Sequence, residues 1–212
     1  MDARRFDSLD RLIGEIDNII KNLSVPRRAS RSVPGPLAAS ALEEGERAES
    51  VRLMRVNHSG EVAAQALYQG QAFTARRPQV KSAMRQAAAE EIDHLAWCDA
   101  RLKELKGRTS LLNPLWYFGS LGIGALAGAL GDRASLGFIA ETEKQVESHL
   151  RNHLRRVSPR DLRSRAILEQ MAHDEAQHGA KAASMGGKAL PFPITWAMRT
   201  TSRLMTHGSY WI

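Results

Sequence analysis

Two short motifs, each a glutamate followed by a histidine three residues later, have the composition of metal-binding sites. They are Glu91-x-x-His94 and Glu175-x-x-His178. Residues three apart lie on one face of a helix, so each motif can present an oxygen and a nitrogen ligand to the same ion. A single motif of this kind also arises by chance among the charges of a solvent-exposed helix face, so its surroundings decide between the two interpretations.

Each motif is preceded at nearly equal distance by another glutamate. Glu61 lies 30 residues before Glu91, and Glu143 lies 32 residues before Glu175. These residues continue apolar helical stripes that should face a core, where an unpaired carboxylate is costly and a cation must lie opposite. Oxygen and nitrogen ligands without a thiolate suit iron or manganese. The sequence therefore predicts a two-metal centre held by Glu61, Glu91, His94, Glu143, Glu175 and His178.

Four neighbours of this set have two interpretations each. Glu90 and Asp174 precede the motif glutamates, and they are either hydrogen-bond partners of the ligand histidines or exposed carboxylates. Tyr68 follows Glu61 by seven residues on the same face, where a packed core tyrosine is favoured over a residue near the metals. His149 lies on a different face from the metal-binding glutamate of its own helix. By spacing alone it is expected to be a surface or packing residue.

Helical periodicity extends over the segments that would carry these residues, and no segment has the pattern of a strand. The long helical segments are 43–75, 78–106, 132–157 and 158–184. Ser158 is predicted as the N-cap of the last of them, with Pro159 in its first turn, and Gly107 as the cap that ends the second. Four long helices with short connections predict an all-α four-helix bundle.

Further segments flank or interrupt this bundle. Residues 1–23 have the apolar spacing of an amphipathic helix, and residues 24–42 form a predicted flexible basic linker. Residues 43–212 are the predicted metal-binding domain. Within it, residues 109–131 carry no charge and contain five glycines, and a short helix over residues 193–206 closes the chain.

The composition is that of a basic globular protein. The chain has 212 residues and a net charge of +7. It contains no C₂H₂ finger, RNP-type strand or basic coiled coil, so we expect an anionic membrane surface as a partner rather than nucleic acid. Its single cysteine, Cys98, excludes an intramolecular disulfide within this sequence and favours a reducing compartment.

Five stretches together resemble a known family. They are Asn57-His58-Ser59-Gly60-Glu61, Glu90-Glu91-Ile92-Asp93-His94-Leu95, Thr142-Glu143-Lys144-Gln145-Val146-Glu147-Ser148-His149-Leu150, Asp174-Glu175-Ala176-Gln177-His178 and Tyr210-Trp211-Ile212. The resemblance is to demethoxyubiquinone hydroxylases of the bacterial type. These form the ubiquinone-biosynthesis branch of the ferritin-like di-iron carboxylate proteins. It covers about residues 43–212 and includes all six predicted ligand positions.

The resemblance implies a fold, a cofactor and a reaction. The fold is a ferritin-like bundle, and the cofactor is a pair of Fe²⁺ ions. Glu91 and Glu175 would bridge the two ions, and His149 would lie near the substrate. The remaining ligands divide so that Glu61 and His94 serve one iron, while Glu143 and His178 serve the other. The implied reaction hydroxylates the ring of 2-polyprenyl-3-methyl-6-methoxy-1,4-benzoquinol with O₂ and an electron donor.

The implied substrate is a membrane lipid, which bears on residues 109–131. This segment either dips into one leaflet and passes the isoprenoid tail to the iron site, or is a buried helix of the bundle. We favour the first interpretation because of the substrate. The implied location is the cytoplasmic side of the cell membrane, as a peripheral protein. A larger ubiquinone-biosynthesis complex is a further expected partner.

Two other functions are compatible with the same motifs. One is another ferritin-like di-iron activity, either iron storage or peroxide reduction. The sequence lacks the Cys-x-x-Cys pairs that a rubredoxin module for peroxide reduction would need. The other is a non-catalytic scaffold that binds a quinone or lipid and holds a structural metal, although six ligands exceed what a structural role needs.

Overall fold

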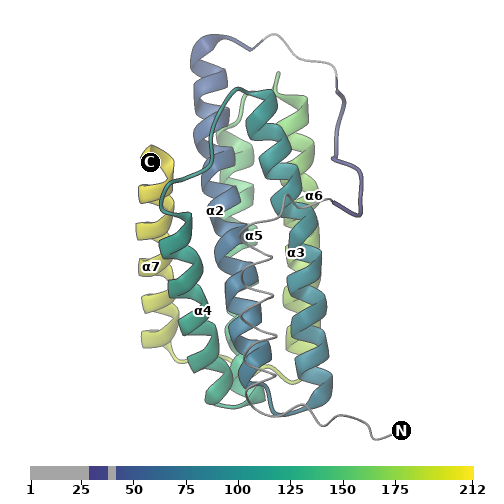
Figure 1. The fold of residues 1–212 in the computed structure, drawn as a ribbon, viewed down its shortest axis with the longest axis vertical. Coiled ribbons are helices and arrows are strands. Elements are labelled where there is room, and N and C mark those ends of the chain that lie inside the picture. The colour runs from purple at the N-terminus through teal and green to yellow at the C-terminus, as the bar shows by residue number, and fades with distance from the viewer. Residues whose placement is uncertain (1–28, 38–41) are drawn as a thin grey trace, which may run out of the picture.

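The fold consists of helices that pack side by side (Figure 1). A computed structural model describes residues 29–37 and 42–212, and these residues contain no strand. The predicted N-terminal helix lies outside the described residues. The helices are α2 (Glu44–Thr74), α3 (Pro78–Glu104), α4 (Asn113–Ala129), α5 (Asp132–Arg156), α6 (Leu162–Ser184) and α7 (Phe192–Trp211). The prediction of an all-α bundle is confirmed.

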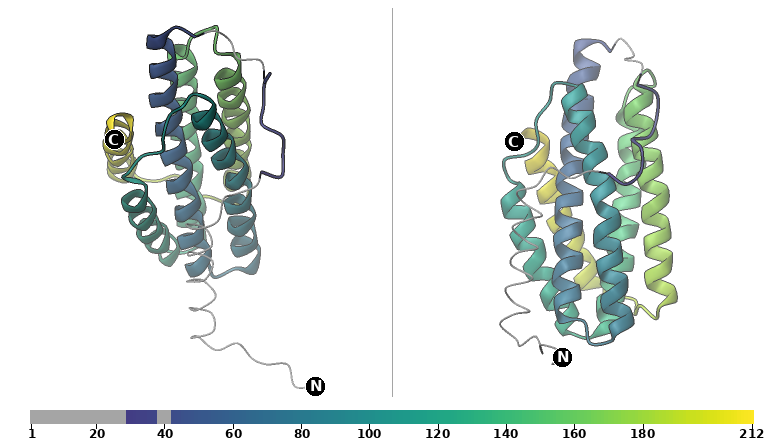
Figure 2. Two further views of the ribbon diagram at one scale, coloured as in Figure 1. Left: turned by 45° about the horizontal axis from the view of Figure 1, so that its top comes forward. Right: turned by 45° about the vertical axis from the view of Figure 1, so that its right-hand side comes forward.

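Helices α2, α3, α5 and α6 form the four-helix bundle, and α4 and α7 lie along one side of it (Figures 1 and 2). Short connections join α2 to α3 and α5 to α6, while the long crossover from α3 to α5 contains α4. The apolar core has two main parts, one around Trp97 and Met171 and the other around Met84 and Ile139. Along its own helix, each of the six predicted ligands lies between residues of the first part and residues of the second.

Asp132 connects the start of α5 to the turn between α2 and α3. Its carboxylate accepts hydrogen bonds from the backbone N–H groups of Arg76 and Arg77, both at 2.9 Å. The Arg77 side chain adds an ion pair at 3.1 Å. Gly131, just before it, has a φ of 105°, which a residue with a side chain adopts only with strain. These contacts fix the end of the bundle where the crossover enters.

Two predicted helix ends are wrong in detail. Helix α6 begins at Leu162 rather than after Ser158, because Asp161 is the N-cap and accepts a hydrogen bond from the Ser164 backbone N–H at 3.0 Å. Helix α3 ends at Glu104, and the left-handed residue beyond it is Lys106, with a φ of 57°. Gly107 instead lies so close to Val51 that a side chain there would collide with it.

Helix α4, within the uncharged segment, has one face packed closely on α2. Side chains at Gly70, Gly124 or Gly128 would collide with atoms of the facing helix, so glycine at these positions permits the close approach. The opposite face leaves Leu115, Phe118, Leu126 and Leu130 exposed. The buried-helix interpretation therefore holds for one face only. No helix among the described residues is both long enough and apolar enough to cross a bilayer.

Helix α7 is longer than the predicted helix over residues 193–206. It continues to Trp211 because its last turns pack against the start of α4. The Trp116 indole N–H donates a hydrogen bond to the buried Ser209 hydroxyl at 3.0 Å, and Gly208 lies against Leu112 and Trp116. Helices α4 and α7 thus pack on the bundle as a pair.

Removal of the Asp161 side chain should destabilise the whole bundle. Its fully buried carboxylate also accepts hydrogen bonds from Arg101 at 2.7 Å and Ser50 at 2.6 Å. Asp161→Ala leaves Arg101 without its buried partner, so we expect the free energy of unfolding to fall by about 3 kcal/mol. Urea denaturation of the metal-free protein measures this. Asp99→Ala, which removes a surface pair with Lys103, should cost less than about 1 kcal/mol. Equal losses for the two variants would contradict this account of Asp161.

Candidate metal centre

Four glutamates from four different helices meet in the middle of the bundle. Glu61 lies on α2, Glu91 on α3, Glu143 on α5 and Glu175 on α6, and each is at most 2% exposed. Ligand atoms of the first, second and fourth lie within 4.8 Å of one another and of His94. A second group with the same spacing contains Glu143, Glu175 and His178. The structure therefore brings all six predicted ligands together, with Glu175 common to both groups.

Both histidines turn the same ring nitrogen toward these carboxylates. His94 Nδ1 lies 3.0 Å from Glu91 Oε2 and 3.1 Å from Glu175 Oε1. His178 Nδ1 lies 3.3 Å from Glu91 Oε1 and 3.5 Å from Glu175 Oε2. Glu91 and Glu175 thus each approach both imidazoles. This central position agrees with the bridging role that the family resemblance implies for them.

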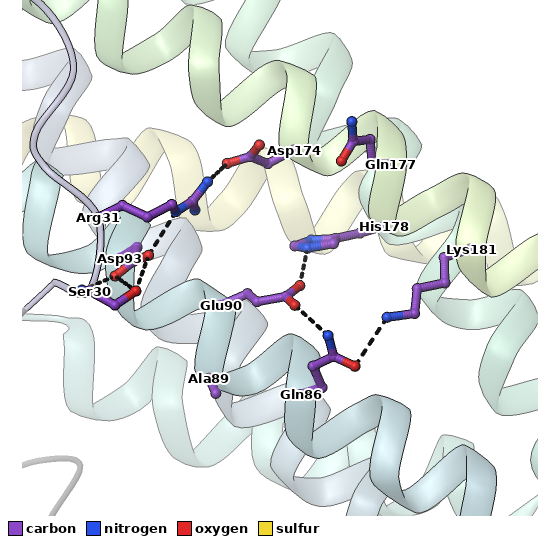
Figure 3. Close-up of a pocket in the computed structure, with 10 residues that line it drawn as sticks. All are labelled: Ser30, Arg31, Gln86, Ala89, Glu90, Asp93, Asp174, Gln177, His178 and Lys181. Carbon is purple, nitrogen blue, oxygen red and sulfur yellow. Dashed lines mark hydrogen bonds and ion pairs between the residues drawn. The ribbon is translucent and has the colours of Figure 1, made fainter.

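The outer nitrogen of each histidine meets a carboxylate from the opposite motif helix. His94 Nε2 lies 2.9 Å from Asp174 Oδ2 on α6. Figure 3 shows the other contact, in which His178 Nε2 lies 2.8 Å from Glu90 Oε2 on α3. A carboxylate at Nε2 accepts the proton there and leaves the Nδ1 lone pair free to bind a metal. Glu90 and Asp174 therefore have the geometry of hydrogen-bond partners of the histidines.

Tyr68 is buried beside the cluster, and its hydroxyl donates a short hydrogen bond to Glu143 Oε1. Burial and the charge of Glu143 hold the pKa of this phenol well above its usual range, so the hydroxyl keeps its proton. Tyr68 is therefore both a packed core residue and a neighbour of the ligands, so both interpretations from the sequence apply to it. The ring packs in the core while the hydroxyl fixes one of the four glutamates.

The four carboxyl groups are of two kinds, those whose pKa is raised and those whose pKa is lowered. Desolvation raises the pKa of Glu61 and Glu143 well above the usual range. For Glu91, burial acts in the same direction, but the charge of His94 and the histidine hydrogen bonds outweigh it and lower the pKa. Burial disfavours charge on His178, yet the nearby Glu175 and Glu91 carboxylates raise its pKa to about 10. Without a metal, the cluster therefore retains protons that limit its negative charge.

The donor set fits divalent metal ions. Several buried atoms that face the cluster form no hydrogen bond to any described residue: Glu91 Oε1, Glu143 Oε2, Glu175 Oε1 and His178 Nδ1. Buried polar atoms without partners are rare, and these have the positions and chemistry of ligand atoms. Oxygen and imidazole donors without sulfur suit iron or manganese. The six residues could hold two ions, with Glu91 and Glu175 between them.

His149 is not among the clustered ligands. It lies beside a pocket of about 630 Å³ between α5 and α7. Its ring centroid is 3.9 Å from that of His153, and its Nε2 forms no hydrogen bond to a described residue. His153 Nδ1 lies 2.8 Å from the side-chain oxygen of Asn57. The predictions missed His153, although it is four residues after His149 and so on the same helix face.

A second residue that the sequence analysis missed is Arg31, from the segment predicted as linker. It pairs with Asp93 at 2.7 Å and with Asp174 at 2.8 Å. These contacts join residues more than 60 positions apart, so no helical spacing indicates them.

The arrangement of the helices and the buried carboxylate–histidine cluster define a ferritin-like bundle with a centre of the metal-binding type. A solved dodecameric thioferritin from Bacteroides fragilis has the same fold, with a TM-score of 0.55 and 17% identity. The similarity covers 64% of this chain and 82% of that chain. The predicted ferritin-like fold is therefore confirmed.

Comparison with protein families is more specific. The family described as "Ubiquinone biosynthesis protein COQ7" matches residues 48–209. A protein from Bordetella parapertussis named 3-demethoxyubiquinol 3-hydroxylase is 54% identical, over 99% of this chain and 96% of its own length. Relatives of the same name from Nitrosomonas europaea and Nitrosococcus oceani are 53% and 52% identical, over 97% and 100% of this chain and 99% and 100% of their own lengths. This chain belongs to the COQ7 family of ubiquinone biosynthesis proteins, as the resemblance of its motifs predicted.

The buried histidine pair should make stability depend on pH. Burial and Arg156 lower the pKa of His149 to about 4, and burial and its neighbours His149 and Arg156 lower that of His153 to about 2, from an ordinary 6.5. These two histidines resist protonation in the folded state but not in the unfolded chain. The free energy of unfolding is therefore at its full value above about pH 6.5 and decreases as the pH falls below it. At pH 5.5 each histidine should lower the free energy of unfolding by about 1 kcal/mol.

Urea denaturation of metal-free protein at pH 7.5 and 5.5 checks this prediction. His153→Asn should reduce the loss of stability between these pH values by about 1 kcal/mol. His173→Asn, at an exposed position on α6, is the matched control for removal of a histidine. An unchanged pH dependence in His153→Asn would contradict the assignment of the effect to this pair.

Proposed function

We propose that this chain is a di-iron monooxygenase that hydroxylates the ring of 2-polyprenyl-3-methyl-6-methoxy-1,4-benzoquinol in ubiquinone biosynthesis. The observation that carries the proposal is the buried cluster of four glutamates and two histidines. The names of the relatives support the substrate. The reaction adds one atom of O₂ to the ring and reduces the other to water, with two electrons from a donor and two protons.

Two Fe²⁺ ions are the proposed cofactor. Glu61 and His94 would hold one ion and Glu143 and His178 the other. Glu91 and Glu175 would bridge them, in keeping with their short distances to both histidines. When bound, the iron pair supplies the redox chemistry that activates O₂.

The remaining side chains position these ligands and exclude water. Asp174 and Glu90 hold the Nε2 protons of the histidines, so that Nδ1 faces inward. Tyr68 donates a hydrogen bond to Glu143 and fixes that carboxylate. Trp97, in the apolar core, packs against the His94 ring, with the ring centroids 5.3 Å apart and the planes tilted by 46°. A dry, fixed set of ligands limits side reactions that involve water while O₂ is reduced.

We further propose that His149 faces the quinol ring. Its buried Nε2 has no hydrogen-bond partner among the described residues and lies beside the pocket between α5 and α7. An imidazole that is kept neutral by a pKa of about 4 can donate or accept one hydrogen bond to a quinol hydroxyl. This proposal agrees with the family resemblance around Glu143-Lys144-Gln145-Val146-Glu147-Ser148-His149.

We also propose that the protein binds the cytoplasmic surface of the cell membrane as a peripheral protein. Helices α4 and α7 lie on the same side of the bundle (Figures 1 and 2). Both expose large apolar side chains. These include Phe118, Leu126, Leu130, Trp196, Leu204 and Trp211. Apolar side chains insert at the interfacial region, and the net charge of +7 adds attraction to anionic lipid. A bound bilayer would supply the lipid substrate on this side.

Hydroxylation is tested with protein purified anaerobically with ferrous iron. We expect about two irons per chain, oxidation by O₂, and conversion of a short-tailed demethoxyquinol to a product heavier by one oxygen atom. Glu91→Ala and Glu175→Ala should lower iron content and reduce the rate more than about 100-fold, because even outer partners of ligands cost 10–100-fold. Mass spectrometry of the quinone and iron analysis give the two readouts.

The matched control is Glu147→Ala on α5, which removes a carboxylate that pairs with the exposed Arg151. It should keep both iron and activity. Iron loading far above two per chain would favour storage, and a metal that never reacts with O₂ would favour a scaffold. Unchanged iron content in Glu91→Ala and Glu175→Ala would overturn the metal centre itself.

Membrane binding is tested by flotation with vesicles that contain anionic lipid. Replacement of Phe118, Leu126 and Trp196 by serine should reduce the bound fraction at least about tenfold, because each exposed apolar side chain contributes on the order of 1 kcal/mol or more when buried in lipid. The control replaces Phe73 and Leu162, exposed apolar residues outside α4 and α7, and should float like the unchanged protein. Equal flotation of all three proteins would exclude the α4–α7 side as the membrane-binding surface.

A further inference from the structure

The described part of the basic N-terminal segment, residues 29–37, lies against α3 and α6. The Ser30 backbone N–H donates a hydrogen bond to Asp93 on α3 at 2.6 Å. On the α6 side, Arg163 donates to the carbonyl oxygen of Gly35 at 2.5 Å. Gly35 has a φ of 84° and packs against Ala166, so glycine is required at this contact. The segment therefore docks on both helices that carry the Glu-x-x-His motifs.

Arg31 is the residue of this segment that spans the two helices. Its Nε donates to Asp93 Oδ2 on α3 at 2.7 Å, and its Nη1 donates to Asp174 Oδ2 on α6 at 2.8 Å (Figure 3). The guanidinium also lies over the Trp97 ring, 4.6 Å from the centroid. The planar fork of arginine suits such a bridge, since lysine offers a single charged nitrogen. Both aspartates are nearly buried, whereas the Arg31 side chain is 42% exposed.

The Asp174 oxygen that accepts from Arg31 is also the one that meets His94. His94 Nε2 lies 2.9 Å from Asp174 Oδ2, and its Nδ1 faces Glu91 and Glu175. A continuous set of contacts therefore runs from Arg31 through Asp174 to the predicted metal ligand.

Among the described residues, no lysine or arginine pairs with the outer carboxylate of the other histidine. Glu90, the partner of His178, accepts a hydrogen bond from the neutral side chain of Gln86 at 2.8 Å. Lys181 bonds to Gln86 at 3.3 Å rather than to Glu90 (Figure 3). The half of the cluster that contains His94 and the half that contains His178 thus have similar ligands. They differ in the side chain that holds the outer carboxylate, Asp174 in the first half and Glu90 in the second.

We propose that Arg31 is a positioning residue for the half of the metal centre that contains His94. Its ion pair fixes Asp174 so that the carboxylate keeps the His94 Nε2 proton and Nδ1 stays directed at the metal. This inference rests on the proposed metal centre but not on its substrate. It gives the segment before the bundle a role at the metal site.

Positioning and simple electrostatics predict opposite results for the loss of Arg31. Removal of a positive charge near a cation site should, by charge alone, strengthen metal binding. If Arg31 positions His94, its removal frees Asp174 to turn toward the pocket that Arg31 and His178 also line (Figure 3), and metal binding weakens. The direction of the change therefore distinguishes the two effects.

The experiment is an anaerobic titration of metal-free protein with Fe²⁺ in competition with a chromophoric chelator. In Arg31→Gln we expect one of the two metal equivalents to bind about tenfold more weakly, because loss of support for a ligand histidine costs 10–100-fold. Arg31→Lys keeps the charge but not the fork, so it should fall between the unchanged protein and Arg31→Gln.

The matched control is Arg160→Gln. Arg160 also bridges two carboxylates, Glu43 and Glu46, both at 2.8 Å, and is about as exposed, but none of the three belongs to the cluster. It should leave both equivalents unchanged. Thermal unfolding of the metal-free variants shows whether Arg31→Gln and Arg160→Gln fold. If Arg31→Gln fails to fold, Arg31→Lys provides a milder substitution for the same test.

A double-mutant cycle tests the route through Asp174. Asp174→Ala should weaken the same equivalent, and Arg31→Gln should add little in that background because the two act in series. Asp93→Asn, which leaves the Arg31–Asp174 pair in place, should bind metal normally. Unchanged or tighter binding in Arg31→Gln, full additivity with Asp174→Ala, or an equal loss in Asp93→Asn would overturn the proposal. Absence of hydroxylated product with this binding pattern intact would count against the proposed function alone.

Discussion

Repulsion among four carboxyl groups in the dry centre of the bundle is the constraint on which the rest of the structure depends. Glu61, Glu91, Glu143 and Glu175 are each almost fully buried, and no packing of apolar residues could offset four uncompensated charges there. In the metal-free protein, protons on two of these groups and the neighbouring imidazoles limit the charge. Divalent cations satisfy the same groups more completely, because each ion replaces several protons and hydrogen bonds at once.

Such a cluster binds metal well only if the helices hold their relative positions. Buried polar contacts at the ends of the bundle provide this, since Asp132 fixes the turn between α2 and α3, and Asp161 connects α6 to Arg101 and Ser50. Close to the ligands, each histidine is held by a carboxylate from the opposite helix. Helix packing and the outer hydrogen bonds therefore position the same few ligand atoms, and a structural change in either would displace a ligand.

Local patterns were sufficient to predict the helices and the six clustered residues, because a carboxylate within an apolar helical stripe must face the core. Helix ends were less predictable. Ser158 satisfies the usual N-cap preference, but Asp161 caps α6 because Arg101, from another helix, holds it there. The role of Arg31 was also hidden, since its partner Asp174 is 143 residues away and the surrounding composition indicates a linker. Periodicity reports which face of a helix is buried, whereas contacts between distant segments depend on how the helices pack.

The two sides of the bundle differ in a way that suits a lipid substrate. Helices α4 and α7 cover one side with exposed apolar residues, and the segment 29–37 crosses the other with charged contacts (Figures 1 and 2). On the apolar side, close glycine contacts place α4 directly on α2, the helix that carries Glu61. On the polar side, the partly exposed Arg31 pairs with the nearly buried Asp174, which in turn contacts His94. The proposed membrane-binding face and the contacts that support the ligands thus lie on different sides of the bundle, and a change at one side can leave the other intact.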